Sequence, residues 1–220
     1  MERLPSIDVL FREIIEYYCN TLNFNVKQIA FLQALFQWFC VTLPYGKQKK
    51  FDINVKFIIF AMKKKTTLEL VEQSEKVSLY SISFAKDRTT EFESFLSKFE
   101  KEASLNEDYQ RILYALSIIL DKGALERYFR PEGKMNDDLY ALPIDGGRIR
   151  LFCLRISDEI LILGNGDQKR TSTYEQDARL YGYALDLQKF DRLLQKDIEA
   201  GIVTVEEKEL THIEDREYLL

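Results

Sequence analysis

In the segment 77–84, larger apolar residues alternate with smaller or polar ones. Successive side chains of an extended chain point to opposite faces. The two faces here would be Leu79, Ser81 and Ser83, and Tyr80, Ile82 and Phe84. The pattern predicts a β-strand with one buried face.

Two helices are predicted after this strand. Thr90 and Glu93 have the spacing of a capping box, in which each side chain bonds the backbone N–H of the other residue. The apolar residues that follow share one helix face: Phe92, Phe95, Leu96 and Phe99. A second helix begins at Asn106, whose side chain can cap it, and ends at Gly123. Its buried stripe is Ile112, Leu113, Leu116, Ile119 and Leu120. The charges within EFESFLSKFEKE are assigned to the solvated face of the first helix.

Three short apolar segments, 137–144, 148–156 and 159–165, are predicted to be strands. The turns between them, around Gly146 and Asp158, are too short for the long crossover that parallel neighbours require. The strands are therefore antiparallel. Residues 77–171 are predicted to form one α+β domain: a strand, a two-helix hairpin, and a three- to four-stranded antiparallel sheet.

The segments on either side of this domain carry weaker signals. Residues 62–76 are rich in lysine and polar side chains and are predicted to be a linker or a short helix. Within residues 172–220, a final helix over 185–201 ends at Gly201. The acidic tail beyond it is expected to add an edge strand or to remain loose.

Residues 1–61 are richer in aromatic and poorer in charged side chains than the rest of the chain. Ser6 and Asn25 can cap two helices, and 51–62 alternates like a strand. The boundary falls at Met62. Three interpretations stay open for this region: a helical N-terminal extension, a membrane or partner segment, or an upstream stretch outside the native protein, with Met62 as the native start.

Composition narrows the classes of function. The apolar content of 46% is ordinary for a globular core, and the net charge of −5 argues against a protein that coats nucleic acid through bulk positive charge. Any phosphate must therefore bind at a local cluster of basic residues. Three cysteines without CxxC spacing and the single His212 assemble neither a zinc site nor a disulfide framework. No cofactor or metal is expected, and a reducing cytoplasm is the predicted compartment.

Cationic residues gather around the predicted sheet: Arg127, Arg130, Lys134, Arg148, Arg150, Arg155, Lys169 and Arg170. Arg148 and Arg150 are two positions apart on a strand, so both guanidinium groups should point the same way and hold one phosphate. Arg155 falls on the opposite face. Tyr174 is one of several nearby aromatic residues on which a base can stack. The alternative is that these arginines are solvated or paired with acids such as Asp138.

The element order, together with the segments KMNDDLYALPI, GGRIRLFCLRISD and EILILGNGDQKRT, resembles the RelE/ParE superfamily of toxins. The resemblance is to its phage-derived HigB-like branch and covers residues 77–171. That branch has a lysine before one strand, an arginine in a following strand, and a basic pair after the last strand. Lys134, Arg150, and the pair Lys169 and Arg170 match these positions.

The resemblance implies a bacterial, cytoplasmic endoribonuclease of a toxin-antitoxin system, with an antitoxin protein, the ribosome and mRNA as partners. Cleavage would proceed without metal, by attack of the RNA 2′-hydroxyl on the adjacent phosphate. The implied catalytic residues are Lys134, Arg148, Arg150 and Lys169. The arginines would stabilise the phosphate, and the lysines would transfer protons or stabilise charge. The implied RNA-binding residues are Arg127, Arg130, Arg170 and Tyr174.

Two other functions stay open. The acidic net charge and Pro143, which stands where the branch has an arginine, favour a non-catalytic protein-interaction module of the same fold. A membrane-associated accessory protein would require insertion of the uncharged stretch 28–45. Its Gln33, Gln37 and Pro44 favour a buried helix instead, so no stable membrane association is expected.

Overall fold

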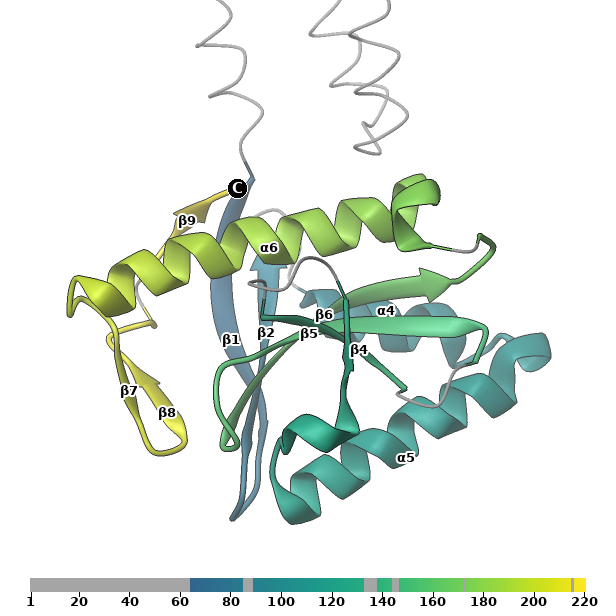
Figure 1. Cartoon of the computed structure of the whole chain (residues 1–220), viewed down its shortest axis with the longest axis horizontal. Helices are drawn as coiled ribbons and strands as arrows, with labels where there is room; N and C mark the ends of the chain where they lie inside the picture. Colours follow the sequence, from purple (N-terminus) through teal and green to yellow (C-terminus); the bar gives the residue numbers. More distant parts are fainter. Residues whose placement is uncertain (1–63, 85–88, 133–137, 144–146, 172, 215) are drawn as a thin grey trace, which may run out of the picture. The chain divides into compact units, whose positions relative to one another are not determined.

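The computed structural model describes residues 64–84, 89–132, 138–143, 147–171, 173–214 and 216–220 (Figure 1). All of them belong to the second of the two units into which the chain divides, Lys63–Leu220. The helices and strand predicted within residues 1–62 lie outside the described residues. Lys134 does so as well.

Seven strands of the described residues form one sheet, in the order β3-β4-β5-β6-β2-β1-β9. Their bounds are β1 Lys65–Gln73, β2 Ser78–Phe84, β3 Arg130–Pro131, β4 Leu139–Leu142, β5 Ile149–Arg155, β6 Ile160–Gln168 and β9 Tyr218–Leu219. All neighbours are antiparallel except β2 and β6, which are parallel. A separate hairpin consists of β7 Thr204–Glu206 and β8 Glu209–Thr211.

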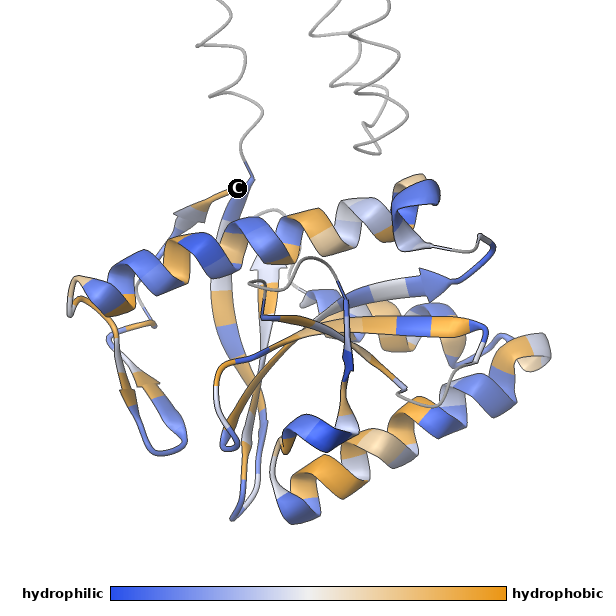
Figure 2. Ribbon diagram, viewed as in Figure 1, coloured by the Kyte–Doolittle hydropathy of each residue, from blue (hydrophilic) through white to orange (hydrophobic). Residues whose placement is uncertain are grey.

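Helices cover both faces of this sheet (Figure 1). The described helices are α4 Glu91–Phe99, α5 Asn106–Lys122 and α6 Ala178–Glu199, with the 3₁₀ turns η1 Ala103–Leu105, η2 Glu126–Tyr128 and η3 Tyr174–Gln176. One apolar core joins α4 and α5 to the sheet, and a second joins α6 to the opposite face. The central strand β5 is accordingly apolar at most positions, and β6 is apolar over its first half (Figure 2).

The predicted fold class, α+β with helices and a mostly antiparallel sheet, is confirmed. The meander β4–β5–β6 is antiparallel, as its short turns indicated. The sheet is larger than the predicted three to four strands, because β1, β3 and β9 extend it on both sides. β1 and β9 come from segments predicted to be linker and tail, and the sequence predicts no element at β3.

The prediction of a linker or short helix over 62–76 is wrong, because most of it is the strand β1. Thr66 and Leu68 are buried, while Leu70 is 53% exposed. The strand pairs with β2 along its length, from Thr66 opposite Phe84 to Gln73 opposite Ser78. The lysines at the start of this segment suggested a linker, and the segment forms a strand because it pairs with β2 and, on its other side, with β9, which is distant in the sequence.

β2 is buried on both faces, not on one as its alternation predicted. Tyr80 and Ile82 enter the core under α6, and Leu79 enters the core under α4 and α5. Ser81 is fully buried, and its hydroxyl accepts the backbone N–H of Phe92 at 3.1 Å. A serine on this face therefore satisfies the first turn of α4 and is not solvated.

The predicted helix boundaries are partly confirmed. Thr90 and Glu93 form the capping box of α4, and Gly123 ends α5 with φ +91°. Asn106 is not the cap that the sequence predicted, because η1 precedes it and the chain enters α5 through Leu105 without a side-chain cap.

The predicted C-terminal helix begins earlier than residue 185. Asp177 caps α6, since its carboxylate accepts the backbone N–H groups of Arg179 and Leu180. The acidic tail does add an edge strand, β9, which pairs with the start of β1. None of the described helices is long and apolar enough to cross a membrane, and the stretch 28–45 lies outside the described residues.

Candidate functional site

The strand β6 extends beyond the end of its pairing with β2. The two strands pair only from Ser78 opposite Ile160 to Ser81 opposite Leu163. Beyond Leu163, β6 continues to Gln168, and β5 is its partner among the described strands. This end of β6 carries a pocket on the side of α6 and a polar network between α4 and α6.

The pocket has a volume of about 210 Å³. Its lining residues come from β3, β5, the segment after β6 and the start of α6: Arg130, Pro131, Glu132, Arg150, Lys169, Thr173, Tyr174, Glu175 and Leu180. It is smaller than the roughly 300–1,000 Å³ typical of drug-sized ligands. The size suits a phosphate with part of one nucleotide.

Three cations meet two carboxylates in this pocket. Arg150 is only 4% exposed, and its Nη1 donates to the carbonyl oxygens of Gly147 at 3.1 Å and Ile149 at 3.0 Å. The Nε of Arg130 lies 3.2 Å from Glu132 Oε1. Lys169 makes no ion pair with any other described residue. The pocket therefore has one fixed guanidinium and one ammonium that can turn toward an anion.

Tyr174 gives the pocket an aromatic wall. Its ring contacts Phe152 edge-on, with centroids 5.6 Å apart, and both residues belong to the core under α6. This contact holds the ring beside the cations, where a nucleobase could stack on it.

Arg148 does not share the pocket with Arg150, so the prediction that both point the same way is wrong. Arg148 donates from Nε to Asp108 Oδ2 at 2.8 Å and from Nη2 to the carbonyl oxygen of Ser104 at 2.7 Å, on the side of α5. Strand alternation does not apply to Arg148, because β5 begins at Ile149. Partial burial opposes ionisation of Asp108, but the bonds from Arg148 hold its pKa below the usual value.

The other predicted RNA-binding residues lie apart from the pocket. Arg127 stacks on Tyr128, with 5.0 Å between its guanidinium carbon and the ring centroid. Arg170 is exposed and does not line the cavity. Of the predicted residues, the pocket thus brings together Arg130, Arg150, Lys169 and Tyr174.

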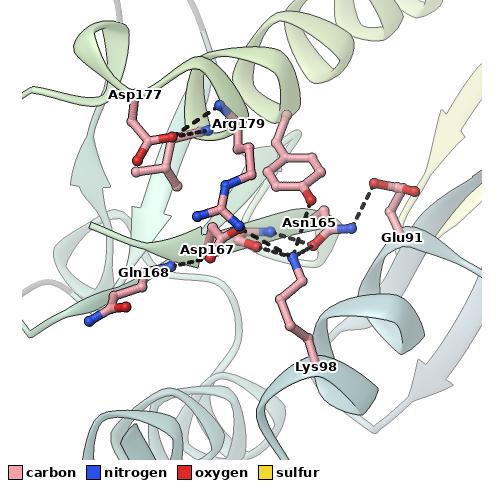
Figure 3. A network of polar contacts seen from close by, with 10 residues as sticks. Glu91, Lys98, Asn165, Asp167, Gln168, Asp177 and Arg179 are labelled. Atoms are coloured by element: carbon pink, nitrogen blue, oxygen red, sulfur yellow. Dashed lines mark hydrogen bonds and ion pairs between the residues drawn. The ribbon is translucent and has the colours of Figure 1, made fainter. Parts of the chain in front are cut away.

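A polar network lies at the same end of β6 (Figure 3). Lys98 reaches from α4 and donates to the carbonyl oxygen of Gly166 at 2.7 Å, to Asn165 Oδ1 at 3.2 Å and to the hydroxyl of Tyr183 at 3.2 Å. Asp167 Oδ2 lies 3.8 Å from the same ammonium and 3.2 Å from Nη1 of Arg179.

The network extends to Glu91, whose carboxylate accepts from the side-chain amide of Asn165 at 2.9 Å. Burial raises the pKa of Glu91 and lowers the pKa of Lys98. Burial also raises the pKa of Tyr183 to about 12, and the carboxylate of Asp167 acts in the same direction. The ammonium has acceptors for its three protons, so the network is suited to holding elements in place.

This network was not predicted from the sequence. Glu91 and Lys98 lie in a charged run that the pattern assigns to the solvated face of a helix. This is wrong for Glu91, which is half-buried, whereas Lys98 is exposed and still bonds β6 and α6. A signal was present in the GNG sequence at 164–166. A β-carbon at Gly166 would overlap the carbonyl oxygen of Arg150, so only glycine allows β5 and β6 to approach there.

No protein-family model, curated protein or solved structure matches this chain. Within the described residues, no group of three His, Cys, Asp or Glu side chains could hold a metal ion. The guanidinium and ammonium groups of the pocket fit a phosphodiester, its aromatic wall fits a base, and its carboxylates can accept a proton.

Proposed function

We propose that the pocket binds an RNA phosphodiester and that the chain is a toxin-like, metal-independent endoribonuclease. The observation that carries the proposal is the convergence of Arg130, Arg150, Lys169 and Tyr174 on one small cavity. The element order supports a RelE-like fold, since β2, α4, α5, β4, β5 and β6 follow one another as in the order on which that resemblance rests, with only the two-residue strand β3 added before β4.

The proposed reaction is attack of the 2′-hydroxyl on the adjacent phosphorus, which forms a 2′,3′-cyclic phosphate and releases the 5′-oxygen. The carboxylate of Glu132 or Glu175 accepts the hydroxyl proton. Arg150 stabilises the charge that develops on the phosphorane oxygens, and Lys169 gives a proton to the leaving oxygen. Tyr174 stacks on a flanking base. Lys134 stays a prediction, because it lies outside the described residues.

The test uses the full chain and an end-labelled RNA oligonucleotide in the presence of a chelator, with and without ribosomes carrying a messenger RNA. We expect products that end in a cyclic phosphate and a 5′-hydroxyl. Arg150→Met should lower the cleavage rate about 100- to 1,000-fold, the cost typical of removing one transition-state donor.

The matched control is Arg111→Met, which removes an exposed arginine of α5 outside the pocket. It should leave the cleavage rate within about twofold, as expected for a surface substitution. Absence of RNA binding and cleavage in both settings would refute the proposal. Binding of RNA or protein without cleavage would favour the non-catalytic module. A growth arrest relieved by a co-expressed partner would identify the proposed antitoxin.

A further inference from the structure

The segment that supplies much of the pocket runs from the end of β6 to the start of α6. It contributes Lys169, Thr173, Tyr174 and Glu175 to the lining. We call its described part, residues 168–171 and 173–178, the pocket segment. The backbone N–H of Lys169 donates to the carbonyl oxygen of Arg148 at 2.6 Å, so β5 holds the start of the segment. The distance from Arg150 to Tyr174 depends on how the rest of the segment is held.

An ion pair joins the two ends of the pocket segment. Asp167 is the residue just before it and Arg179 is the residue just after it, and their Oδ2 and Nη1 atoms lie 3.2 Å apart (Figure 3). The same Asp167 carboxylate accepts the backbone N–H of Gln168 at 2.7 Å through Oδ1. Closing a loop at its ends removes much of its conformational freedom.

Asp167 is 5% exposed, so its contacts act in a partly desolvated place. Lys98 supplies a second cation to it from α4, at 3.8 Å. Lys98 also donates to the hydroxyl of Tyr183, one turn beyond Arg179 on α6. The pocket segment is therefore tied at one point to helices that cover opposite faces of the sheet.

We propose that Asp167, Arg179 and Lys98 are positioning residues, which hold the pocket segment so that Tyr174 stands beside Arg150 and Lys169 in a ligand-ready pocket. This inference rests on the proposed function for its ligand, an RNA phosphodiester. It assigns no contact with RNA to the three residues. Without the ion pair, the competent arrangement is a smaller fraction of the population, and apparent affinity falls by that fraction.

The test compares Arg179→Met with Arg111→Met as a matched control. Arg111 is also a half-exposed arginine in an ion pair, with side-chain exposure of 48% against 46% for Arg179, but its partner Glu107 lies on α5. We expect Arg179→Met to weaken binding of a short RNA oligonucleotide at least about fivefold, the lower end of usual coupling effects. Arg111→Met should bind like the unmodified chain.

A merely structural role would lower thermal stability without changing affinity well below the melting temperature. Affinity is therefore measured where both variants are fully folded by circular dichroism. Arg179→Lys, which keeps the charge, should recover part of the lost affinity. Hydrogen–deuterium exchange of the pocket segment, without RNA, should be faster in Arg179→Met than in the control.

The outcomes are distinguishable. If the unmodified chain binds RNA, Arg150→Met does not, and Arg179→Met binds normally, the positioning inference is overturned and the proposed function stands. If the unmodified chain binds no RNA, the proposed function fails, and the exchange measurement decides separately whether the ion pair holds the segment. Equal exchange rates in Arg179→Met and the control would overturn the inference in that case.

Discussion

Replacing Gly166 with alanine adds a single methyl group, and we expect this change to lower the stability of the fold. Gly166 lies in β6 opposite Leu151 of β5. A β-carbon there would overlap the carbonyl oxygen of Arg150, and it would lie 2.7 Å from the Arg150 carbonyl carbon and 2.9 Å from Leu151 Cα. All three of these atoms belong to the backbone, so no side-chain rotation can relieve the contact.

Gly166→Ala must therefore move β5 and β6 apart at this pair. Overpacking a well-packed core lowers the free energy of unfolding by about 1–3 kcal/mol. We expect a value at the upper end of this range, because the three nearest atoms all belong to the backbone. In a unit of this size, a loss of about 3 kcal/mol lowers the melting temperature by about 6–12 °C. The separation would also displace Arg150, so RNA binding should weaken together with stability.

The assay is thermal unfolding followed by circular dichroism, with Gly201→Ala as the control. Gly201 has φ +67°, and a β-carbon there would have nothing within 4 Å, so alanine carries only backbone strain of about 1–2 kcal/mol. We expect the Gly166 variant to melt clearly below the Gly201 variant. Equal melting temperatures would show that β5 and β6 do not approach as closely as described.

Two further predictions concern the start of α4. Thr90→Ala should lower the free energy of unfolding by about 1–2 kcal/mol in urea, because the capping box loses the 3.1 Å bond from Glu93 N–H to the Thr90 hydroxyl. Thr173→Ala removes a threonine that precedes η3 without a capping bond and should change this free energy little. Glu91→Gln should raise the urea midpoint near pH 7. Burial raises the pKa of Glu91, so folding favours the protonated form, and stability falls as the pH rises through that pKa. The advantage of glutamine should shrink as the pH falls through the raised pKa of Glu91 and should be lost below the ordinary glutamate pKa; a constant advantage at all pH values would contradict this reasoning.

Local signals in the sequence predicted local structure well. The Thr90–Glu93 box and the stop at Gly123 each depend on a few neighbouring residues, and the structure contains both. Asn106 failed as a cap because η1, a short turn without a sequence signature of its own, leads directly into the helix.

Features that depend on distant partners were not predictable in the same way. β1 becomes a strand because β2 and β9 pair with it, and its lysine-rich start suggested a linker instead. The bonds of Lys98 reach residues 67, 68 and 85 positions away, which no periodic pattern indicates. Lys98 is exposed, as its place in a charged run indicates, but its bonds to β6 depend on the fold.

The candidate pocket was predicted in part. Arg150 and Lys169 were identified by their place around the sheet, and both line the cavity. Arg148 was grouped with Arg150 by strand spacing, but it lies one residue before the strand begins and pairs with Asp108. Glu132 and Glu175 carried no signal, since a carboxylate in a loop is distinguished only by the cations that fold around it.

The pairing of β1 with β9 has a consequence for synthesis of the chain. Lys64 exchanges backbone hydrogen bonds with Leu220, and Lys65 stands opposite Leu219. A ribosome makes the chain from its N-terminal end, so β1 is synthesised well before its outer neighbour β9. The edge of the sheet at β1 therefore stays unpaired until β9 has left the ribosome, and until then it can pair with other extended chains in the cell.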